Sequence, residues 1–420
     1  MEDTATEETD TRALIFRHTL SNNIRAIFEK RDRIETVSIG FWFLTGPRDE
    51  APEERGLTHL LEHLLFRTNS KRIPYNNIAK AIEGLGGVIN GLTQKEFTGV
   101  FITIPSKHLL TGITILSEMC FSPVFNHAEL EREKQIISHE IGSESNSELQ
   151  FTENQFFHSI LSGHSLAQPI TGTFESIQQV SLEKAYQYHE KVWSPDNCVI
   201  TACGDVDLQA LFQGLESVLG KYQQSKQKRN SRTAPEYVKI DRELKCQFRN
   251  THIIAGTAFP TPVSISEFYG LLIISTLFGE TMSSRLKQDL RNTKGLCYSV
   301  GSQRHFFSDI SFFTIQSSAH REKPDTLKHA LIHQINTLHT EPPSEEEILF
   351  AKEHLSGIFL IGNQDTETRI HFLLNHIIHG DTPHSLKESI DCLNTIQSPF
   401  LYDMIEKYLT IDTFSFLCTQ

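Results

Sequence analysis

Two histidines and one glutamate stand within five residues of the stretch GLTHLLEHLLF, which begins at Gly56. If this stretch is helical, His59 and His63 lie four positions apart on one face, and both imidazoles can reach a single metal ion. Glu62 is turned by about 100° from His63, which places its carboxylate beside such an ion and not on it. A base in that position could act on water next to the metal. Because the chain contains 20 histidines, roughly one chain in ten of this composition would carry HxxEH by chance, so an ordinary helix surface is the alternative.

A third ligand is expected, because a catalytic zinc ion usually has three protein ligands and one open position. The best source is the acidic stretch ELEREKQIISHEIGSE, in which Glu133 and Glu140 are seven residues apart and would share one face of a helix. The alternative is a solvated acidic surface, but Ile136, Ile137 and Ile141 favour a helix that packs against other elements. The spacing alone does not choose between Glu133 and Glu140 as the ligand.

The sequence predicts helices at both places, set among strands. Apolar residues at 57, 60, 61, 64 and 65 predict a helix over 57–66. The apolar runs VSIGFWFLT and FTGVFITI are typical of strands, and HLLTGITILSEMC has helical periodicity. This mixture predicts an α+β fold in which helices pack on a mostly antiparallel sheet.

The same pattern occurs twice along the chain. FITI in the first half resembles FFTI 211 residues later. Asn126 with Glu129, and Ser344 with Glu347 218 residues later, both look like capping boxes that begin a helix. We therefore predict two homologous domains that arose by duplication.

The expected domain boundaries follow from the length and from one polar stretch. A chain of 420 residues exceeds what one hydrophobic core usually supports. The basic stretch KYQQSKQKRNSRTAPEY is typical of a linker. We predict a zinc-binding domain over 12–222, a linker over 223–236 and a homologous domain without metal over 237–420. At the offset of 218, Glu140 corresponds to Ile358, which cannot bind an ion.

Composition restricts the partners and the compartment. A formal net charge of −13 argues against binding of nucleic acid, which needs clustered Lys and Arg. No apolar run approaches the roughly 18 to 20 residues that span a bilayer, and the acidic N-terminus lacks the features of a secretory signal or transit peptide. Seven dispersed cysteines without a CxxC pair are typical of reduced thiols. We expect a cytoplasmic protein without nucleic-acid or membrane partners.

Several stretches together resemble the pitrilysin/insulinase family of zinc metallopeptidases, namely TGPRDEAPEERGLTHLLEHLLFRTNSKR, LGGVINGLTQKEFT, PITGTFESI, VWSPDNCVITACGDVD and SSRLKQDLRNTKGLCYSV. HxxEH is the inverted zincin motif. The chain is similar to the short, two-domain bacterial members and to subunits of the mitochondrial processing peptidase. The resemblance implies one zinc ion per chain, held by His59, His63 and Glu140. It also implies that Glu62 is the catalytic base and that Glu133 is a further catalytic glutamate, which supports the ligands from behind.

The resemblance further implies how substrate binds. An extended peptide would add as a strand to the edge strand GGVINGLT, which contains Asn90. Gly91 stands where the family usually has alanine, so a looser substrate strand is expected. Arg291 and Tyr298 would clamp the substrate. The predicted function is that of a zinc-dependent endopeptidase, which cleaves unfolded or presequence-like peptides inside a closed chamber.

The predicted partners are peptides and a second chain, either identical or related. In such a dimer the Arg/Tyr pair of one chain would serve the zinc site of the other. The alternative is a non-catalytic structural subunit of the same family, although such members usually lack part of the zinc motif or of the Arg/Tyr pair. His371, His376 and His379 are expected to belong to a mostly buried helix and not to a second metal site.

Overall fold

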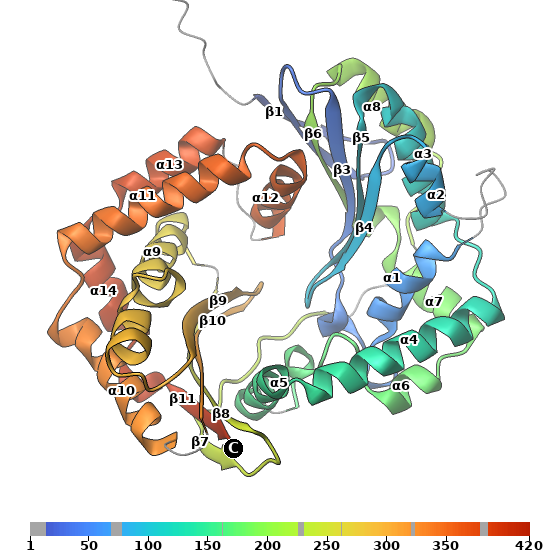
Figure 1. Ribbon diagram of the computed structural model, residues 1–420. Helices are drawn as coiled ribbons and strands as arrows, with labels where there is room; N and C mark the ends of the chain where they lie inside the picture. The colour runs from blue at the N-terminus through green and yellow to red at the C-terminus, as the bar shows by residue number, and fades with distance from the viewer. Residues whose placement is uncertain are drawn as a thin grey trace, which may run out of the picture.

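The structure is a computed structural model (Figure 1). It describes residues 14–68, 78–161, 163–225, 231–261, 263–320, 324–378 and 385–420. Part of the predicted linker (226–230), the start of the predicted first domain and His379 lie outside these ranges. Two sheets with helices packed on them make up the chain (Figure 1), which confirms the predicted α+β class.

The first sheet is antiparallel except at one pair of strands. Its strands are β1 (Leu14–Thr19), β2 (Arg25–Lys30), β3 (Thr36–Phe43), β4 (Val88–Thr93), β5 (Thr98–Pro105) and β6 (Cys198–Gly204). They lie in the order β1-β2-β6-β3-β5-β4, and only β2 and β6 run parallel. Strand β4 therefore forms one edge of this sheet.

The second sheet repeats the topology of the first. Its strands are β7 (Asp241–Leu244), β8 (Asn250–Pro260), β9 (Ser299–Phe306), β10 (Ile310–His320) and β11 (Ser415–Thr419). The order β7-β11-β8-β10-β9 matches β2-β6-β3-β5-β4 strand for strand, and the one parallel pair is again the first. The stretches FITI and FFTI occupy the equivalent strands β5 and β10. The structure thus confirms the predicted duplication.

Helices cover both sheets in a repeated order. The first half has α1 (Leu57–Phe66), α2 (Ile78–Glu83), α3 (Leu109–Phe121), α4 (His127–Asn146), α5 (Glu148–Ile160), α6 (Phe174–Gln178), α7 (Leu182–Val192) and α8 (Leu208–Leu219). The second has α9 (Ile265–Ser275), α10 (Pro324–Thr340), α11 (Glu345–Gly362), α12 (Thr366–Ile378), α13 (Leu386–Thr395) and α14 (Ser398–Tyr408). No helix among the described residues is long and apolar enough to cross a membrane.

The two predicted capping boxes differ. Ser344 forms a complete box at the start of α11, because its hydroxyl accepts from the backbone N–H of Glu347 and its backbone N–H donates to the Glu347 carboxylate. At the start of α4, the Asn126 side chain accepts from the backbone N–H of Glu129 at 2.9 Å. The side chain of Glu129 instead pairs with Arg132, three residues along the helix. The prediction of a full box at Asn126 is therefore wrong.

Each half sends one helix across to the sheet of the other half (Figure 1). Helix α5 packs on the second sheet, where it forms a buried cluster that includes Phe156, Ile160, Ile254, Phe312 and Leu417. Helix α12 packs on the first sheet, where it forms a buried cluster that includes Trp42, Phe101, Cys203, Ile370 and Leu374. The halves are therefore joined through two apolar contacts that only the tertiary structure creates.

Buried charges near the linker add a third contact between the halves. Arg232, in the described part of the linker, donates two hydrogen bonds of 2.8 Å to the carboxylate of Asp49. Arg48 donates to Glu96 at 2.5 Å and also to Asp309, on the turn between β9 and β10. The end of the linker is thus fixed by ion pairs.

Candidate metal centre

Helix α1 carries the HxxEH residues and is fixed by its apolar side. Leu57, Leu60, Leu61, Leu64 and Leu65 are all buried, as their spacing predicts, and the helix has the predicted bounds. His59, Glu62 and His63 are left half-buried on the other side of the helix.

Glu50 holds the start of this helix. Its carboxylate accepts hydrogen bonds from the backbone N–H groups of Gly56 at 2.8 Å and Thr58 at 2.7 Å, two donors that the helix itself leaves unpaired. Gly56 has a left-handed φ of 81°, and a Cβ there would lie 2.6 Å from the carbonyl oxygen of Thr171. Burial raises the pKa of Glu50 to about 7, in spite of these hydrogen bonds.

Helix α4 presents Glu133 and Glu140 on one face toward α1. Leu130 and Ile137 are buried and pack this face into the core. Glu133 is buried, whereas Glu140 is half-buried and lies further along the same helix. The prediction of a packed helix is correct in preference to a solvated acidic surface.

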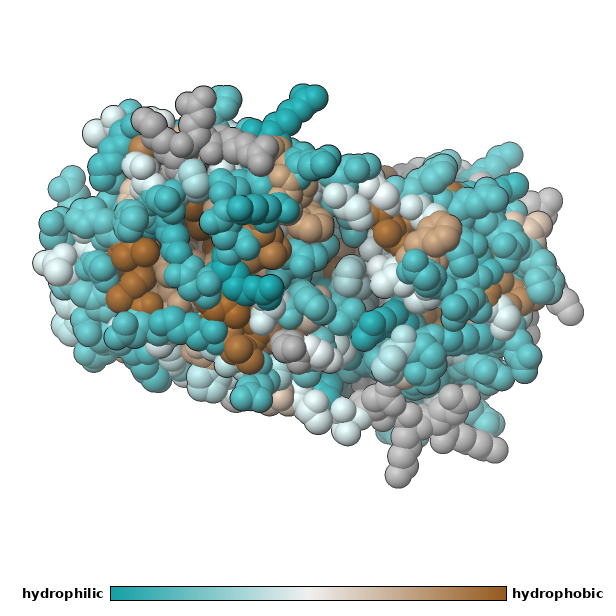
Figure 2. Space-filling view, turned by 90° about the horizontal axis from the view of Figure 1, so that it is seen from below, coloured by the Kyte–Doolittle hydropathy of each residue, from teal (hydrophilic) through white to brown (hydrophobic). Residues whose placement is uncertain are grey.

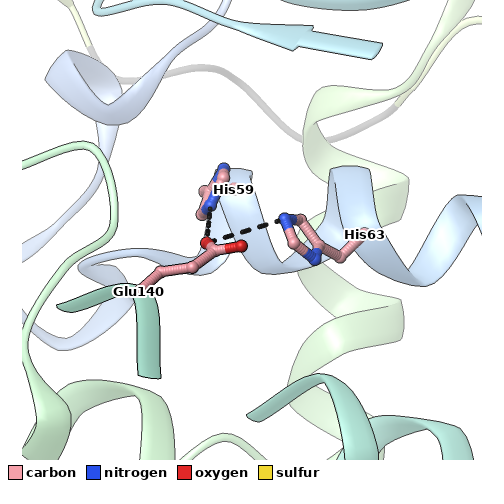
Figure 3. Close-up of side chains that lie close together, drawn as sticks. All are labelled: His59, His63 and Glu140. Carbon is pink, nitrogen blue, oxygen red and sulfur yellow. Dashed lines mark hydrogen bonds and ion pairs between the residues drawn. The ribbon is translucent and has the colours of Figure 1, made fainter. Parts of the chain in front are cut away.

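His59, His63 and Glu140 lie together (Figure 3). Nε2 of His59 is 3.1 Å, and Nε2 of His63 is 3.9 Å, from the same carboxylate oxygen of Glu140. One donor atom from each residue falls within 4.8 Å of the others. Two imidazole nitrogens and one carboxylate oxygen at such separations fit a zinc ion about 2.0 to 2.2 Å from each donor. Among the described residues no other group of histidine, cysteine or carboxylate side chains converges in this way.

Glu133 is placed behind His63 and not beside the cluster. One of its carboxylate oxygens is 3.0 Å from Nδ1 of His63, and the other accepts from Nε of Arg67 at 2.7 Å. Burial opposes the charge on Glu133, but the hydrogen bonds to His63 and Arg67 outweigh it and lower the pKa of this carboxyl. Burial favours the neutral form of His63 and would by itself lower its pKa. The hydrogen bond to Glu133 and the nearby carboxylates outweigh burial and raise the pKa of His63. A proton on Nδ1 of His63, directed at Glu133, leaves the Nε2 lone pair free on the side of Glu140. The geometry therefore gives the two glutamates different positions relative to His63, a difference that their spacing in the sequence could not show.

Glu62 is held by strand β4. Its carboxylate accepts a hydrogen bond of 2.5 Å from Oγ1 of Thr93, which in turn lies 2.9 Å from Oγ1 of Thr98. One Glu62 oxygen is 3.9 Å from Nδ1 of His59. A Cβ on Gly91 would lie 2.4 Å from the other oxygen of Glu62. The glycine therefore provides room for the carboxylate.

The predicted substrate residues do not all meet at the cluster. Asn90 is exposed on β4, next to Gly91, and its side chain accepts from the backbone N–H of Gly91. Arg291 is exposed in a π-helical segment, Lys287–Thr293, and Tyr298 is 50% exposed just before β9. Neither Arg291 nor Tyr298 lines a cavity at the cluster of its own chain.

One cavity lies at the cluster, and a larger one adjoins it. A cavity of about 460 Å³ is lined by His59, Glu62 and Glu140. It shares Leu92, Glu144 and Ile170 with a larger cavity of about 760 Å³, which lies between the halves. His59 and Glu140 therefore face a space large enough for several residues of a peptide.

Sequence reasoning missed three residues that position the site, namely Glu50, Arg67 and Thr93. Arg67 is four residues after His63, at the C-cap of the same helix, a spacing that could have suggested a shared partner. Thr93 is on the predicted substrate strand, but its contact with Glu62 depends on how α1 packs against that strand. Glu50 had no signal beyond its place ahead of the helix.

Family models match most of the chain in two parts. The first half, at residues 25–173, matches the model described as insulinase (peptidase family M16). Residues 179–355 match the model described as peptidase M16 inactive domain. The chain belongs to the insulinase family. All residues of the metal cluster lie in the part that matches the first of these models.

Curated relatives in the insulinase family carry zinc protease names. The chain is 28% identical to the uncharacterized zinc protease YmxG of Bacillus subtilis, over 85% of this chain and 86% of the relative. It is 25% identical to the uncharacterized zinc protease Rv2782c of Mycobacterium tuberculosis, over 89% and 86%. These names support a zinc protease family.

Solved structures show the same fold. A protease from Helicobacter pylori superposes with a TM-score of 0.89 at 18% identity, over 97% of this chain and 99% of the other. A peptidase M16 inactive domain from Pseudomonas fluorescens gives a TM-score of 0.89 at 15% identity, with 97% of each chain covered. Both structures thus share the fold of this chain over nearly its whole length.

Proposed function

We propose that this protein is a zinc-dependent endopeptidase that cleaves unfolded peptides. One observation carries the proposal: Nε2 atoms of His59 and His63 converge with the Glu140 carboxylate, while Glu62 stands beside them without joining them. The names of the relatives support zinc as the ion. Nitrogen and oxygen donors of this kind suit zinc among several divalent ions.

His59, His63 and Glu140 would hold the zinc ion. When bound, zinc polarises a carbonyl group and lowers the pKa of a water molecule toward about 7. Glu62 is placed to accept the proton of an attacking water and to donate it to the leaving amine. Thr93 keeps the Glu62 carboxylate in place through its 2.5 Å hydrogen bond, so that the base is already oriented when substrate binds.

Edge strand β4 is suited to hold the peptide. Its residues from Val88 to Leu92 are exposed or half-buried, and the strand has a sheet neighbour on one side only, β5. A peptide that adds as a further strand would be held by main-chain hydrogen bonds and would pass Asn90 beside Glu62. Such binding accepts many sequences and requires an extended, unfolded chain.

A second chain would complete the substrate site. Arg291 and Tyr298 are exposed and lie outside the cavities at the cluster of their own chain. The second half also exposes apolar side chains, seen on the left in Figure 2. Five of these exposed apolar side chains belong to helix α11, namely Leu349, Phe350, Ile358, Leu360 and Ile361. These features support a dimer, with itself or a related chain, in which the Arg/Tyr pair of each chain serves the partner's zinc site.

Two substitutions test the endopeptidase proposal. Glu62→Gln should keep zinc and lose cleavage, because the amide cannot accept a proton, whereas His63→Ala should lose both. Bound zinc and cleavage of a fluorogenic peptide are measured on each, with His127→Ala, at an exposed position of α4, as the matched control. Cleavage by Glu62→Gln would contradict the role of the base, and full zinc in His63→Ala would contradict the ligand set.

The alternative function is that of a non-catalytic structural subunit. It would be favoured if the zinc-loaded chain cleaved none of a library of unfolded peptides.

Sharing of sites is tested separately, by mixing Glu62→Gln chains with Tyr298→Phe chains. Partial return of activity in the mixture, together with a dimer in sedimentation, is the expected result. A mixture no more active than its components would argue against shared sites.

A further inference from the structure

A small apolar pocket opens from the large cavity, on the side of the second half. Its volume is about 170 Å³. Its walls are mainly aromatic and come from four elements: Phe268 and Tyr269 from α9, Phe306 from β9, Phe359 from α11 and Phe372 from α12. None of the described residues that line it is acidic, and its polar members are few.

The walls are held by packing and by one buried ion pair. The rings of Phe268 and Phe306 have centroids 5.1 Å apart, and those of Tyr269 and Phe359 are 6.3 Å apart. Phe372 lies under the guanidinium of Arg369, with 4.2 Å between that group and the ring centroid. Arg369 is itself bound to buried Glu29 of the first sheet. The pocket is thus formed where α12 crosses between the halves.

The pocket is connected to the metal cluster through the cavities. Phe268, Leu272, Phe306 and Asn375 line both the pocket and the cavity of about 760 Å³. That cavity in turn shares Leu92, Glu144 and Ile170 with the space at the cluster. A peptide bound at the metal ligands can therefore extend toward the pocket without leaving the protein.

We propose that this pocket binds one aromatic side chain of the peptide substrate, away from the bond that is cut. An apolar cavity of about 150 Å³ is enough to hold a benzene ring, so the volume of about 170 Å³ suits a phenyl group. Ring walls provide edge and face contacts for another ring. The lack of a lining carboxylate disfavours lysine or arginine. The inference rests on the proposed peptidase function and adds a specificity to it.

Quenched fluorescent peptides test the preference. A single Phe is moved stepwise away from a fixed cleavage site in an otherwise polar peptide, and Ala and Lys peptides are made for each position. Burial of a Phe side chain predicts a KM about tenfold lower than that of the Ala peptide at one spacing. No preference at any spacing, or an equal preference for Lys, would overturn the inference.

A substitution at the boundary of the pocket links the preference to this place. Asn375 is exposed on α12 and lies between pocket and cavity, so Asn375→Trp should block entry without disturbing the core. The Phe/Ala ratio should then fall to near one. Asn336→Trp, the same change at an exposed position of α10 outside the pocket, should keep the ratio. A full ratio in Asn375→Trp would place the aromatic site elsewhere.

Binding without cleavage separates this inference from the proposed function. Anisotropy of labelled Phe and Ala peptides is measured on the Glu62→Gln chain, and again with Asn375→Trp added. Tighter binding of the Phe peptide that depends on Asn375 supports the pocket even if the wild-type chain cleaves nothing. Cleavage of both peptides at equal KM, with equal binding, supports the peptidase and rejects the pocket.

Discussion

Nδ1 of His63 lies 3.0 Å from a carboxylate oxygen of Glu133, and the other oxygen of Glu133 is bound to Arg67. His63 lies in the last turn of α1 and Arg67 directly follows the end of that helix, so one carboxylate of α4 ties both to the neighbouring helix. The contact fixes which imidazole nitrogen carries the proton and which faces Glu140. The orientation of a candidate metal ligand thus depends on a residue that does not itself belong to the cluster.

Glu133→Gln should weaken zinc binding about 10- to 100-fold, because loss of a carboxylate that orients a ligating histidine has effects of that size. The affinity is measured by competition with a chromophoric chelator. Glu129→Gln is the matched control, since Glu129 is on the same helix and contacts only the exposed Arg132 through its side chain. An unchanged affinity in Glu133→Gln would show that packing alone orients His63.

Thr93→Val should lower kcat more than it raises KM. The substitution keeps the shape of the side chain but removes the 2.5 Å hydrogen bond that holds the Glu62 carboxylate. Zinc content should stay the same, because Thr93 does not contact His59, His63 or Glu140. Thr98→Val removes the hydroxyl that contacts Thr93 but leaves the hydrogen bond between Thr93 and Glu62, so it should lower kcat less than Thr93→Val. Equal kcat values for wild type and Thr93→Val would contradict the positioning role.

Glu50 should make stability depend on pH between about 4.5 and 7. Its folded-state pKa of about 7 lies above the ordinary value of 4.5, so the folded protein binds more protons than the unfolded chain in this range. The free energy of unfolding should therefore fall as pH rises through it, by up to about 1.4 kcal/mol per unit. Urea unfolding of metal-free wild type and Glu50→Gln at several pH values measures this. Parallel curves for the two proteins would contradict the assignment.

Arg369→Met should destabilise the chain by about 3 to 5 kcal/mol, because it removes both hydrogen bonds to the buried carboxylate of Glu29 and leaves it a longer ion pair of 3.6 Å with Arg31. Only 3% of the Arg369 side chain and none of the Glu29 side chain is exposed. The double variant Glu29→Leu with Arg369→Met should recover part of the loss. Lys30→Met, which breaks the exposed pair with Asp32, should cost less than about 1 kcal/mol. Equal losses in Arg369→Met and Lys30→Met, measured by chemical denaturation, would contradict the argument.

Local features were predictable because the forces that specify them act within a few residues. The apolar spacing over 57–66 and the capping box at Ser344 both correspond to observed helix starts. The box at Asn126 was predicted from the same pattern, and only half of it forms, since Glu129 has an alternative partner one turn away. A short sequence pattern states which contacts are possible and not which one is made.

By itself, the sequence determined the α+β class, the duplication and the candidate ligands, because periodicity, repeats and motif spacing are written along the chain. Spacing left Glu133 and Glu140 open, and the family resemblance implied Glu140 as the ligand. The tertiary structure shows the physical difference between them, because Glu140 faces both imidazoles while Glu133 stands behind His63. It also decided that α5 and α12 cross to the opposite sheets. Contacts between residues hundreds of positions apart depend on the shape of the whole core, and no local pattern records them.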